Sequence, residues 1–223
     1  MIVWGIDPSS NCGLAIYDTE RHISAVHCEV LTSEKDWDYY FYSVQMGRKL
    51  RERINRFGLP DLIVIEQGSE SSQGTGVNGL IWIWNVIGAI VSVIGIYGVP
   101  IAIIHPATWR KPFYGKHFQC PQKPVMESVV INGVKTTRQV IEKGKPKFKN
   151  DWKTAATDKC TELGVTYPTQ KTIAHNACEA VGMAYEWHHA TVINKEFYDA
   201  FQAMLKQRNE RAPAGDLFQG GAA

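Results

Sequence analysis

No two cysteines of this 223-residue chain stand in a C-x-x-C arrangement. The five cysteines, at positions 12, 28, 120, 160 and 178, are odd in number and widely scattered, which is typical of reduced thiols. His117 and Cys120 have a spacing that zinc can use, but no second ligand pair follows them, which argues against structural zinc there. No signal peptide precedes Ile2, so we expect a cytoplasmic protein.

The chain also has little net charge, only +2, although Asp, Glu, Lys and Arg make up an ordinary 21% of it. The positive charge is nevertheless concentrated in one segment. The segment from Arg110 to Lys153 contains eleven Lys and Arg residues but only three acids, so the rest of the chain is net negative. This asymmetry favours contact with a polyanion, although a solvated lysine-rich loop has the same composition.

One long hydrophobic run, from Leu80 to Ile104, is nearly free of charge and about long enough to cross a bilayer. It is interrupted by Gly and Pro residues, and no basic cluster flanks it closely. We therefore predict a helix over 78–96, a turn over 97–100 and a strand over 101–104. A helix that is apolar all round must be buried on several faces. We expect Trp82, Trp84 and Val86 to meet a second subunit as well as a sheet, which favours a homodimer through the 78–96 helix over a membrane span.

The rest of the pattern predicts one α/β domain with no internal repeats. The chain opens with a hairpin over residues 1–18, and residues 62–65 form a continuous apolar strand. A basic insertion at about 112–147 is either a β-ribbon, with an Asn132-Gly133 turn, or a flexible arm. We expect a further strand at 22–31, helices at about 37–57, 151–163, 172–187 and 195–207, a domain spanning 1–208, and a disordered tail at 209–223.

Three acids are placed in a way that suggests a shared site. Asp7 ends the first strand, Glu66 ends the strand 62–65, and Glu179 lies on the helix 172–187, which can pack across the same sheet edge. Three converging carboxylates would repel one another without cations, and Mg²⁺ prefers oxygen ligands. Two such ions can activate water and stabilise the leaving oxygen in phosphodiester cleavage. The alternatives are that Asp7 is only a turn residue and that Glu66 and Glu179 are unrelated surface acids.

These segments resemble the RuvC family of Holliday junction resolvases, within the ribonuclease H-like superfold. The resemblance spans about residues 1–187 outside the insertion, and it rests on GIDPSSNCGLAIYD (5–18), IVIEQ (63–67), IAIIHPATWRK (101–111), FKNDWKTAA (148–156) and HNACEAVGMAYE (175–186). It implies a mixed five-stranded sheet, with an antiparallel start and parallel strands after it, flanked by helices. It also implies a homodimeric, Mg²⁺-dependent endonuclease (Mn²⁺ substituting) that nicks four-way or other branched DNA in recombination and repair. The compact chain and its insertion would suit a bacteriophage-type member, in a bacterial or phage-infected cell.

Carried over to this chain, the resemblance makes Asp7, Glu66 and Glu179 metal ligands. The family's penultimate acid, normally Asp or His, falls on Asn176, which can ligate through its carbonyl oxygen but brings no charge. His175 is the alternative fourth ligand, although on a helix it points about 100° away. Lys149 and Lys153 are candidates for steadying the scissile phosphate, and the loop 67–79 for contacting the junction. We expect DNA contacts from Arg110, Lys111, Lys116, Lys143, Lys145, Lys147 and Lys149.

Two other functions fit parts of the sequence. Asp7 followed by Ser9, Ser10 and Gly13 resembles the first phosphate loop of actin-like and sugar-kinase phosphotransferases. Those proteins usually need a second such domain, for which 223 residues leave little room. A catalytically weak or inactive DNA-binding module of the same fold is the other alternative, and Asn176 in place of an acid is its warning sign.

Overall fold

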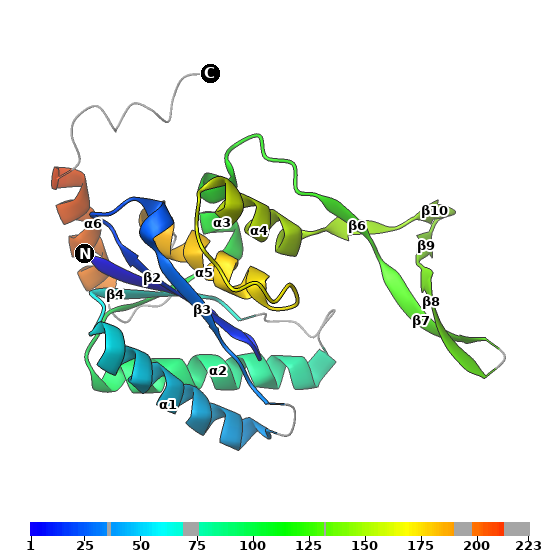
Figure 1. Ribbon diagram of the computed structural model, residues 1–223, viewed down its shortest axis with the longest axis horizontal. Coiled ribbons are helices and arrows are strands. Elements are labelled where there is room, and N and C mark those ends of the chain that lie inside the picture. The colour runs from blue at the N-terminus through cyan, green and yellow to red at the C-terminus, as the bar shows by residue number, and fades with distance from the viewer. Residues whose placement is uncertain (35–36, 69–75, 132, 190–197, 212–223) are drawn as a thin grey trace.

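The computed structural model describes residues 1–34, 37–68, 76–131, 133–189 and 198–211. Its centre is a five-stranded sheet in the order β3-β2-β1-β4-β5 (Figure 1). The first three strands pair antiparallel, whereas β4 and β5 run parallel to β1, so the predicted mixed sheet is confirmed. The strands are β1 (Ile2–Asp7), β2 (Cys12–Asp18), β3 (His27–Leu31), β4 (Leu62–Glu66) and β5 (Ile101–Ile104).

Helices cover both faces of this sheet (Figure 1). Successive strand residues alternate between two cores, so that Trp4 and Ile63 face one layer while Val3 and Leu62 face the other. On one face lie α1 (Tyr39–Phe57) and α2 (Gly76–Ile96); on the other lie α3 (Pro106–Tyr114), α4 (Trp152–Glu162) and α5 (Ala174–Tyr185), with α6 (Tyr198–Arg211) near the sheet edge. Short 3₁₀ turns occupy Ile23–Ala25 and Trp187–His189.

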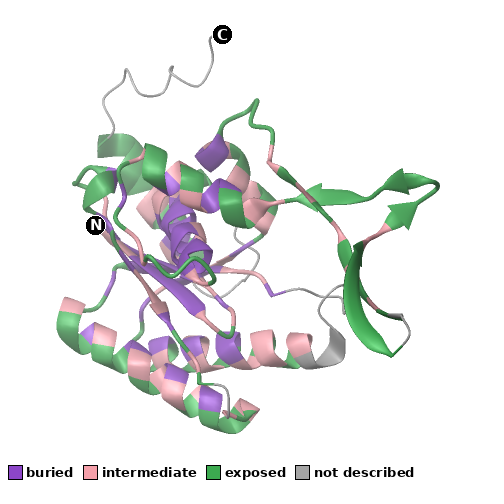
Figure 2. Ribbon diagram, turned by 45° about the vertical axis from the view of Figure 1, so that its right-hand side comes forward, coloured by how far each residue is buried: buried purple, intermediate pink, exposed green. Residues whose placement is uncertain are grey.

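Helix α5 lies unusually close to the sheet because two glycines make room for it. A Cβ on Gly5 would come within 2.1 Å of the Ala180 carbonyl oxygen, and one on Gly13 within 1.9 Å of the Asn176 carbonyl oxygen. Real Cβ atoms do not approach backbone so closely, so both positions require glycine for steric reasons. The close contact fixes α5 over β1 and β2, and α5 is the most deeply buried helix (Figure 2).

Within the single chain, the predicted 78–96 helix is buried on one side only, and burial of its other side against a second subunit stays a prediction. Helix α2 packs Val86, Ile90 and Ile94 against the sheet layer, while Trp82 contacts Tyr42 of α1. Its outer side is exposed at Ile81, Trp84 and Ile96. Residues 79–96 are apolar enough and long enough to span a bilayer, with 22% of them buried. Both sides of α2 are therefore apolar, but only one of them is covered within this chain.

The basic insertion is a β-ribbon that projects away from the domain (Figure 1). Its base pairs β6 (Gln122–Pro124) with β11 (Phe148–Asn150). Beyond the base it forks into two hairpins, and Val125, Val140 and Lys147 exchange backbone hydrogen bonds at the fork. The hairpins are β7 (Met126–Ile131) with β8 (Val134–Gln139) and β9 (Ile141–Glu142) with β10 (Lys145–Pro146). The ribbon interpretation is confirmed over a flexible arm, although Asn132 of the predicted turn lies outside the described residues.

The helix boundaries agree with the predictions to within a few residues, and the ends at Phe57 and Ile96 agree fully, but there are two larger differences. The sequence analysis missed α3, which begins after His105 with Pro106 in its first turn and keeps Pro112 inside it. The predicted insertion start at residue 112 therefore falls within this helix. Helix α6 continues to Arg211, so the first residues of the predicted tail are helical. Residues 212–223 lie outside the described residues.

Candidate active site

A cleft of about 910 Å³ opens where β1 and β4 end. Its walls come from the turn after β1, the end of β4, the base of the ribbon, and helices α4 and α5. All seven residues predicted to be catalytic line it: Asp7, Glu66, Lys149, Lys153, His175, Asn176 and Glu179.

The three acids reach the cleft from three separate elements. Asp7 and Glu66 are the last residues of β1 and β4, which pair in parallel with Ile6 opposite Ile65. Neighbouring parallel strands end at the same edge of a sheet, so the two carboxylates are delivered side by side. Glu179 comes from α5, one residue before Ala180, whose carbonyl oxygen lies over Gly5. The close packing of α5 therefore sets the position of the third acid.

Helix α3 places two side chains against these acids. The indole Nε1 of the buried Trp109 donates a hydrogen bond to Glu66 Oε2 at 2.9 Å. Arg110 lies between two of the acids, because its Nη2 is 3.4 Å from Glu66 Oε2 and 3.4 Å from Glu179 Oε1. Its guanidinium also lies over the rings of Trp109 and Trp152, each 5.2 Å from the ring centre. Arg110, predicted as a DNA contact, thus bridges Glu66 and Glu179 with its guanidinium group.

Burial and neighbouring carboxylates raise the pKa values of two of the three acids. Burial, reinforced by the charges of Glu179 and Glu66, raises the pKa of Asp7 well above its usual range, although Arg110 and Lys153 oppose this. Burial also raises the pKa of Glu179 to about 7, with Arg110 opposing and Glu66 adding to the rise. Both shifts express the free energy of holding carboxylates together in a poorly hydrated place. A divalent cation would relieve that repulsion, and the oxygen donors suit Mg²⁺.

Asn176 and His175 start α5 beside the acids and are both buried. The Asn176 side-chain nitrogen donates to the Asn11 carbonyl and to Ser9 Oγ, which ties α5 to the turn after β1. The amide oxygen is therefore the Asn176 atom that can act as a ligand. Burial, with Lys153 and Lys123 nearby, lowers the pKa of His175 to about 4. His175 is accordingly neutral at pH 7, as a metal ligand or hydrogen-bond acceptor must be.

Of the two lysines predicted to steady the phosphate, Lys153 has the stronger electrostatic coupling to the acids. The charge of Lys153 lowers the pKa values of both Asp7 and Glu179, whereas Lys149 has no comparable effect on either. Lys149 lines the cleft from β11, directly opposite Lys123 of β6. Lys123 was not predicted, and it forms an ion pair with Asp151 at the start of α4. The cleft is therefore lined by basic as well as acidic side chains.

The other predicted DNA contacts lie outside the cleft and are exposed. Lys111 and Lys116 flank the end of α3, and Lys143, Lys145 and Lys147 belong to the ribbon. Lys147, the residue after β10, forms an ion pair with Glu142 of β9, its Nζ lying 2.9 Å from Glu142 Oε2. The loop predicted to contact a junction enters the cleft with Gln67 and Gly68, whereas residues 69–75 lie outside the described residues.

Trp109 is the contact that sequence reasoning missed. Its ring packs where a Cβ on Gly182 of α5 would sit, within 2.4 Å, while its nitrogen holds Glu66. The available signal was His105-Pro106, a helix start in which the His105 ring accepts a hydrogen bond from the Ala107 amide. Recognising that start would have placed Trp109 and Arg110 on one short helix next to the strand that follows Glu66.

No protein-family model matches the chain, and no curated protein sequence matches it. Solved structures do match. T. thermophilus RuvC in complex with a Holliday junction substrate is 15% identical, with a TM-score of 0.54 over 86% of this chain and 99% of that one. A second Thermus thermophilus RuvC structure is 17% identical, with a TM-score of 0.52 over 86% of this chain and 100% of that one. The chain has the RuvC-like, ribonuclease H-like fold that its motifs predict.

Proposed function

We propose that this chain is a divalent-metal-dependent endonuclease that nicks Holliday junctions or related branched DNA. The observation that carries the proposal is the meeting of Asp7, Glu66 and Glu179 in one cleft of a RuvC-like fold. The RuvC structure that contains a Holliday junction substrate shares that fold. Raised pKa values at Asp7 and Glu179 mark a site built for a positive partner, as expected of a metal-dependent nuclease.

The residues of the cleft have separable roles in this reaction. Asp7, Glu66, Glu179 and the Asn176 amide oxygen would hold Mg²⁺, with Mn²⁺ as a substitute. When bound, a pair of such ions supplies an activated water and charge stabilisation at the leaving oxygen. Trp109 orients Glu66 through its hydrogen bond. Lys153 and Lys149 line the same cleft as the acids, where they can hold the phosphate oxygens of the strand to be cut.

The ribbon and the end of α3 extend this basic surface beyond the cleft. The ribbon base contributes Lys123 and Lys149 to the cleft, and its outer part carries the exposed Lys143 and Lys145. A duplex that enters the cleft would therefore meet basic side chains along the ribbon. Phosphate contacts of this kind give most of the affinity in such complexes and make it depend steeply on salt.

We also propose that the protein is a homodimer through α2 and not a membrane protein. The outer side of α2 exposes Ile81 and Ile96, and the neighbouring α1 exposes Tyr40 and Val44 (Figure 1). An apolar surface of this kind is typical of a subunit interface. Light scattering without detergent should give the mass of a dimer, and Ile81→Glu should give a monomer. Val130→Glu, at an exposed ribbon position, is the matched control.

The deciding experiment incubates the protein with a labelled four-way junction, with Mg²⁺, with Mn²⁺ or with chelator. We expect paired nicks with either metal, none with chelator, and little cleavage of a linear duplex of the same sequence. Asp7→Asn should abolish nicking, whereas the matched change Asp18→Asn, at the end of β2 and paired with Arg21, should not. Equal cleavage of linear and branched DNA would refute the structure selectivity.

Two alternatives would give other results in the same assay. A DNA-binding module without chemistry would bind the junction equally with and without Mg²⁺ and would not nick it with Mn²⁺. A phosphotransferase would hydrolyse ATP and leave DNA intact. The described residues contain one sheet of this type, and not the second phosphate-binding domain that actin-like enzymes use. Within the nuclease proposal, a cytoplasmic location in a bacterial or phage-infected cell fits the five free thiols.

A further inference from the structure

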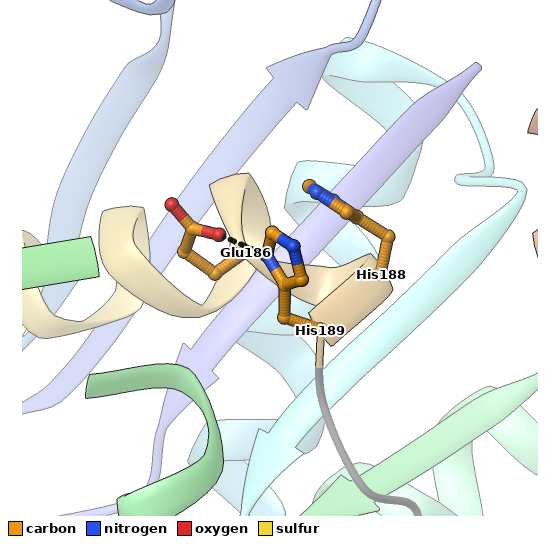
Figure 3. A group of neighbouring side chains, drawn as sticks. All are labelled: Glu186, His188 and His189. Carbon is orange, nitrogen blue, oxygen red and sulfur yellow. Dashed lines mark hydrogen bonds and ion pairs between the residues drawn. The ribbon is translucent and has the colours of Figure 1, made fainter. Parts of the chain in front are cut away.

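A second cluster of metal-binding side chains lies at the far end of α5. Glu186, His188 and His189 bring one ligand atom each to within 4.8 Å of the others, the only such trio of Asp, Glu, His and Cys side chains in the described part of the chain. Figure 3 shows them converging from the helix end and the following 3₁₀ turn. None of them lines the catalytic cleft.

The hydrogen bonding of the cluster leaves one nitrogen unaccounted for. His189 Nδ1 and Glu186 Oε2 are 2.6 Å apart, so these two side chains satisfy each other (Figure 3). His188 Nδ1 is buried and has no hydrogen-bond partner in the structure. A simple ion pair between Glu186 and His189 therefore explains two of the three groups and not the third. Buried polar atoms normally have partners, so an unpaired ring nitrogen beside a buried carboxylate needs an explanation.

The chemistry of the three groups narrows the choice of partner. Burial lowers the pKa of the His188 ring to about 3, so at pH 7 it is neutral and carries a lone pair that can bind a metal. Burial also raises the pKa of Glu186, although His189, Arg208 and Lys159 oppose the rise. Two imidazoles and a carboxylate suit Zn²⁺, whereas Mg²⁺ prefers a set of oxygen ligands.

We propose that Glu186, His188 and His189 bind one Zn²⁺ ion, with the fourth position open to water. The exposed His189 gives the ion access to solvent, while Glu186 and His188 anchor it in the fold. The site would fasten the C-terminal end of α5, the helix that carries Asn176 and Glu179 nearer its start. Its role would be to stabilise that helix, and it is chemically separate from the nuclease site.

The test starts from full-length protein stripped of metal. Excess Mg²⁺ is added to fill sites made of oxygen ligands, and Zn²⁺ is then titrated in. We expect one equivalent to bind at micromolar or lower concentration and to raise the melting temperature. Co²⁺ should show the visible absorption of a tetrahedral site. His188→Gln and His189→Gln should each weaken Zn²⁺ binding at least tenfold, and their metal-free melting temperatures show whether they fold. His22→Ala, an exposed histidine bonded to Ser24, is the control and should bind like the wild type.

Either of two results would overturn the site. One is the absence of stoichiometric Zn²⁺ binding by the wild type. The other is binding that survives in folded His188→Gln and His189→Gln protein, which would place the ion elsewhere. Asp7→Asn should bind Zn²⁺ normally, because its change lies in the catalytic cleft. Since the readout is metal binding and not cleavage, this inference and the proposed nuclease function fail independently of each other.

Discussion

Replacing Glu179 with Gln should stabilise the metal-free protein at high pH and have little effect at low pH. The neutral amide keeps the shape of the side chain but removes one of three neighbouring negative charges. Burial and Glu66 raise the pKa of Glu179 from 4.5 to about 7, despite Arg110 at 3.4 Å. The native state therefore holds its proton more tightly than the unfolded chain does. Such a group lowers stability as the pH rises from 4.5 to 7, and the loss is complete above 7.

The size of the effect follows from the shift. A rise from 4.5 to about 7 corresponds to roughly 3 kcal/mol at about pH 8, and to under about 1 kcal/mol at about pH 5. The Glu179 side chain is only 13% exposed, so solvent screening reduces this little. In the presence of chelator at high pH, the free energy of unfolding of Glu179→Gln should exceed that of the wild type by up to this amount. Urea unfolding at the two pH values, followed by tryptophan fluorescence, measures both numbers.

Two outcomes distinguish this reasoning from a structural role for Glu179. If the carboxylate served mainly as the partner of Arg110, Gln would destabilise the protein by a similar amount at both pH values, which would refute the argument. Added Mg²⁺ gives the second readout. It should stabilise the wild type more at about pH 8 than at about pH 5, because protonated ligands must lose their protons first. In Glu179→Gln this pH-dependent gain should shrink.

Three further changes test the cleft, the ribbon and the packing of α5. Asp7→Asn should abolish junction cleavage while leaving junction affinity within about twofold, because it adds no atoms; a parallel loss of binding in a gel-shift titration would contradict its role as a ligand. Lys143→Ala with Lys145→Ala should weaken junction binding and lower the salt slope by roughly 0.9 per lost phosphate contact, with cleavage at saturation retained. Gly13→Ala should destabilise the protein by about 1–3 kcal/mol or more in urea unfolding, because its Cβ would collide with the Asn176 backbone. Gly144→Ala, on the ribbon at φ +75 with no atom near its Cβ, measures backbone strain alone.

The sheet could be predicted because each of its strands can be recognised from its own sequence. Residues 62–65 form an apolar run that ends on Glu66, and the hairpin over residues 1–18 has a clear turn between two apolar strands. Asp7 and Glu66 could be grouped because the carboxyl ends of neighbouring parallel strands lie at the same edge of a sheet. Glu179 could be added only as a residue on a helix that can pack across that edge, since nothing local shows that this helix passes over Gly5.

The misjudged elements are those in which tertiary contacts override local pattern. Helix α3 contains Pro112 and has mixed composition, so periodicity gives it no strong signal. Its stability comes from Trp109 and Phe113, which are buried against the sheet and α5. For α2, the uniform apolar sequence predicted burial on several faces, one of them against a second subunit. In the single chain one side of α2 is exposed, so burial of that side stays a prediction.

The insertion at 112–147 was placed outside the family resemblance, yet its residue Lys123 lines the cleft. Lys123 and Lys149 face each other across β6 and β11, and both line the cavity that contains the acids. Lys123 also holds Asp151, so the same strand pair leads directly into α4 and Lys153. The outer hairpins can therefore affect DNA affinity separately, whereas changes at the base should affect catalysis too. An informative ribbon deletion must accordingly keep Val125 and Lys147, whose backbone groups bond at 2.9 Å where the fork begins.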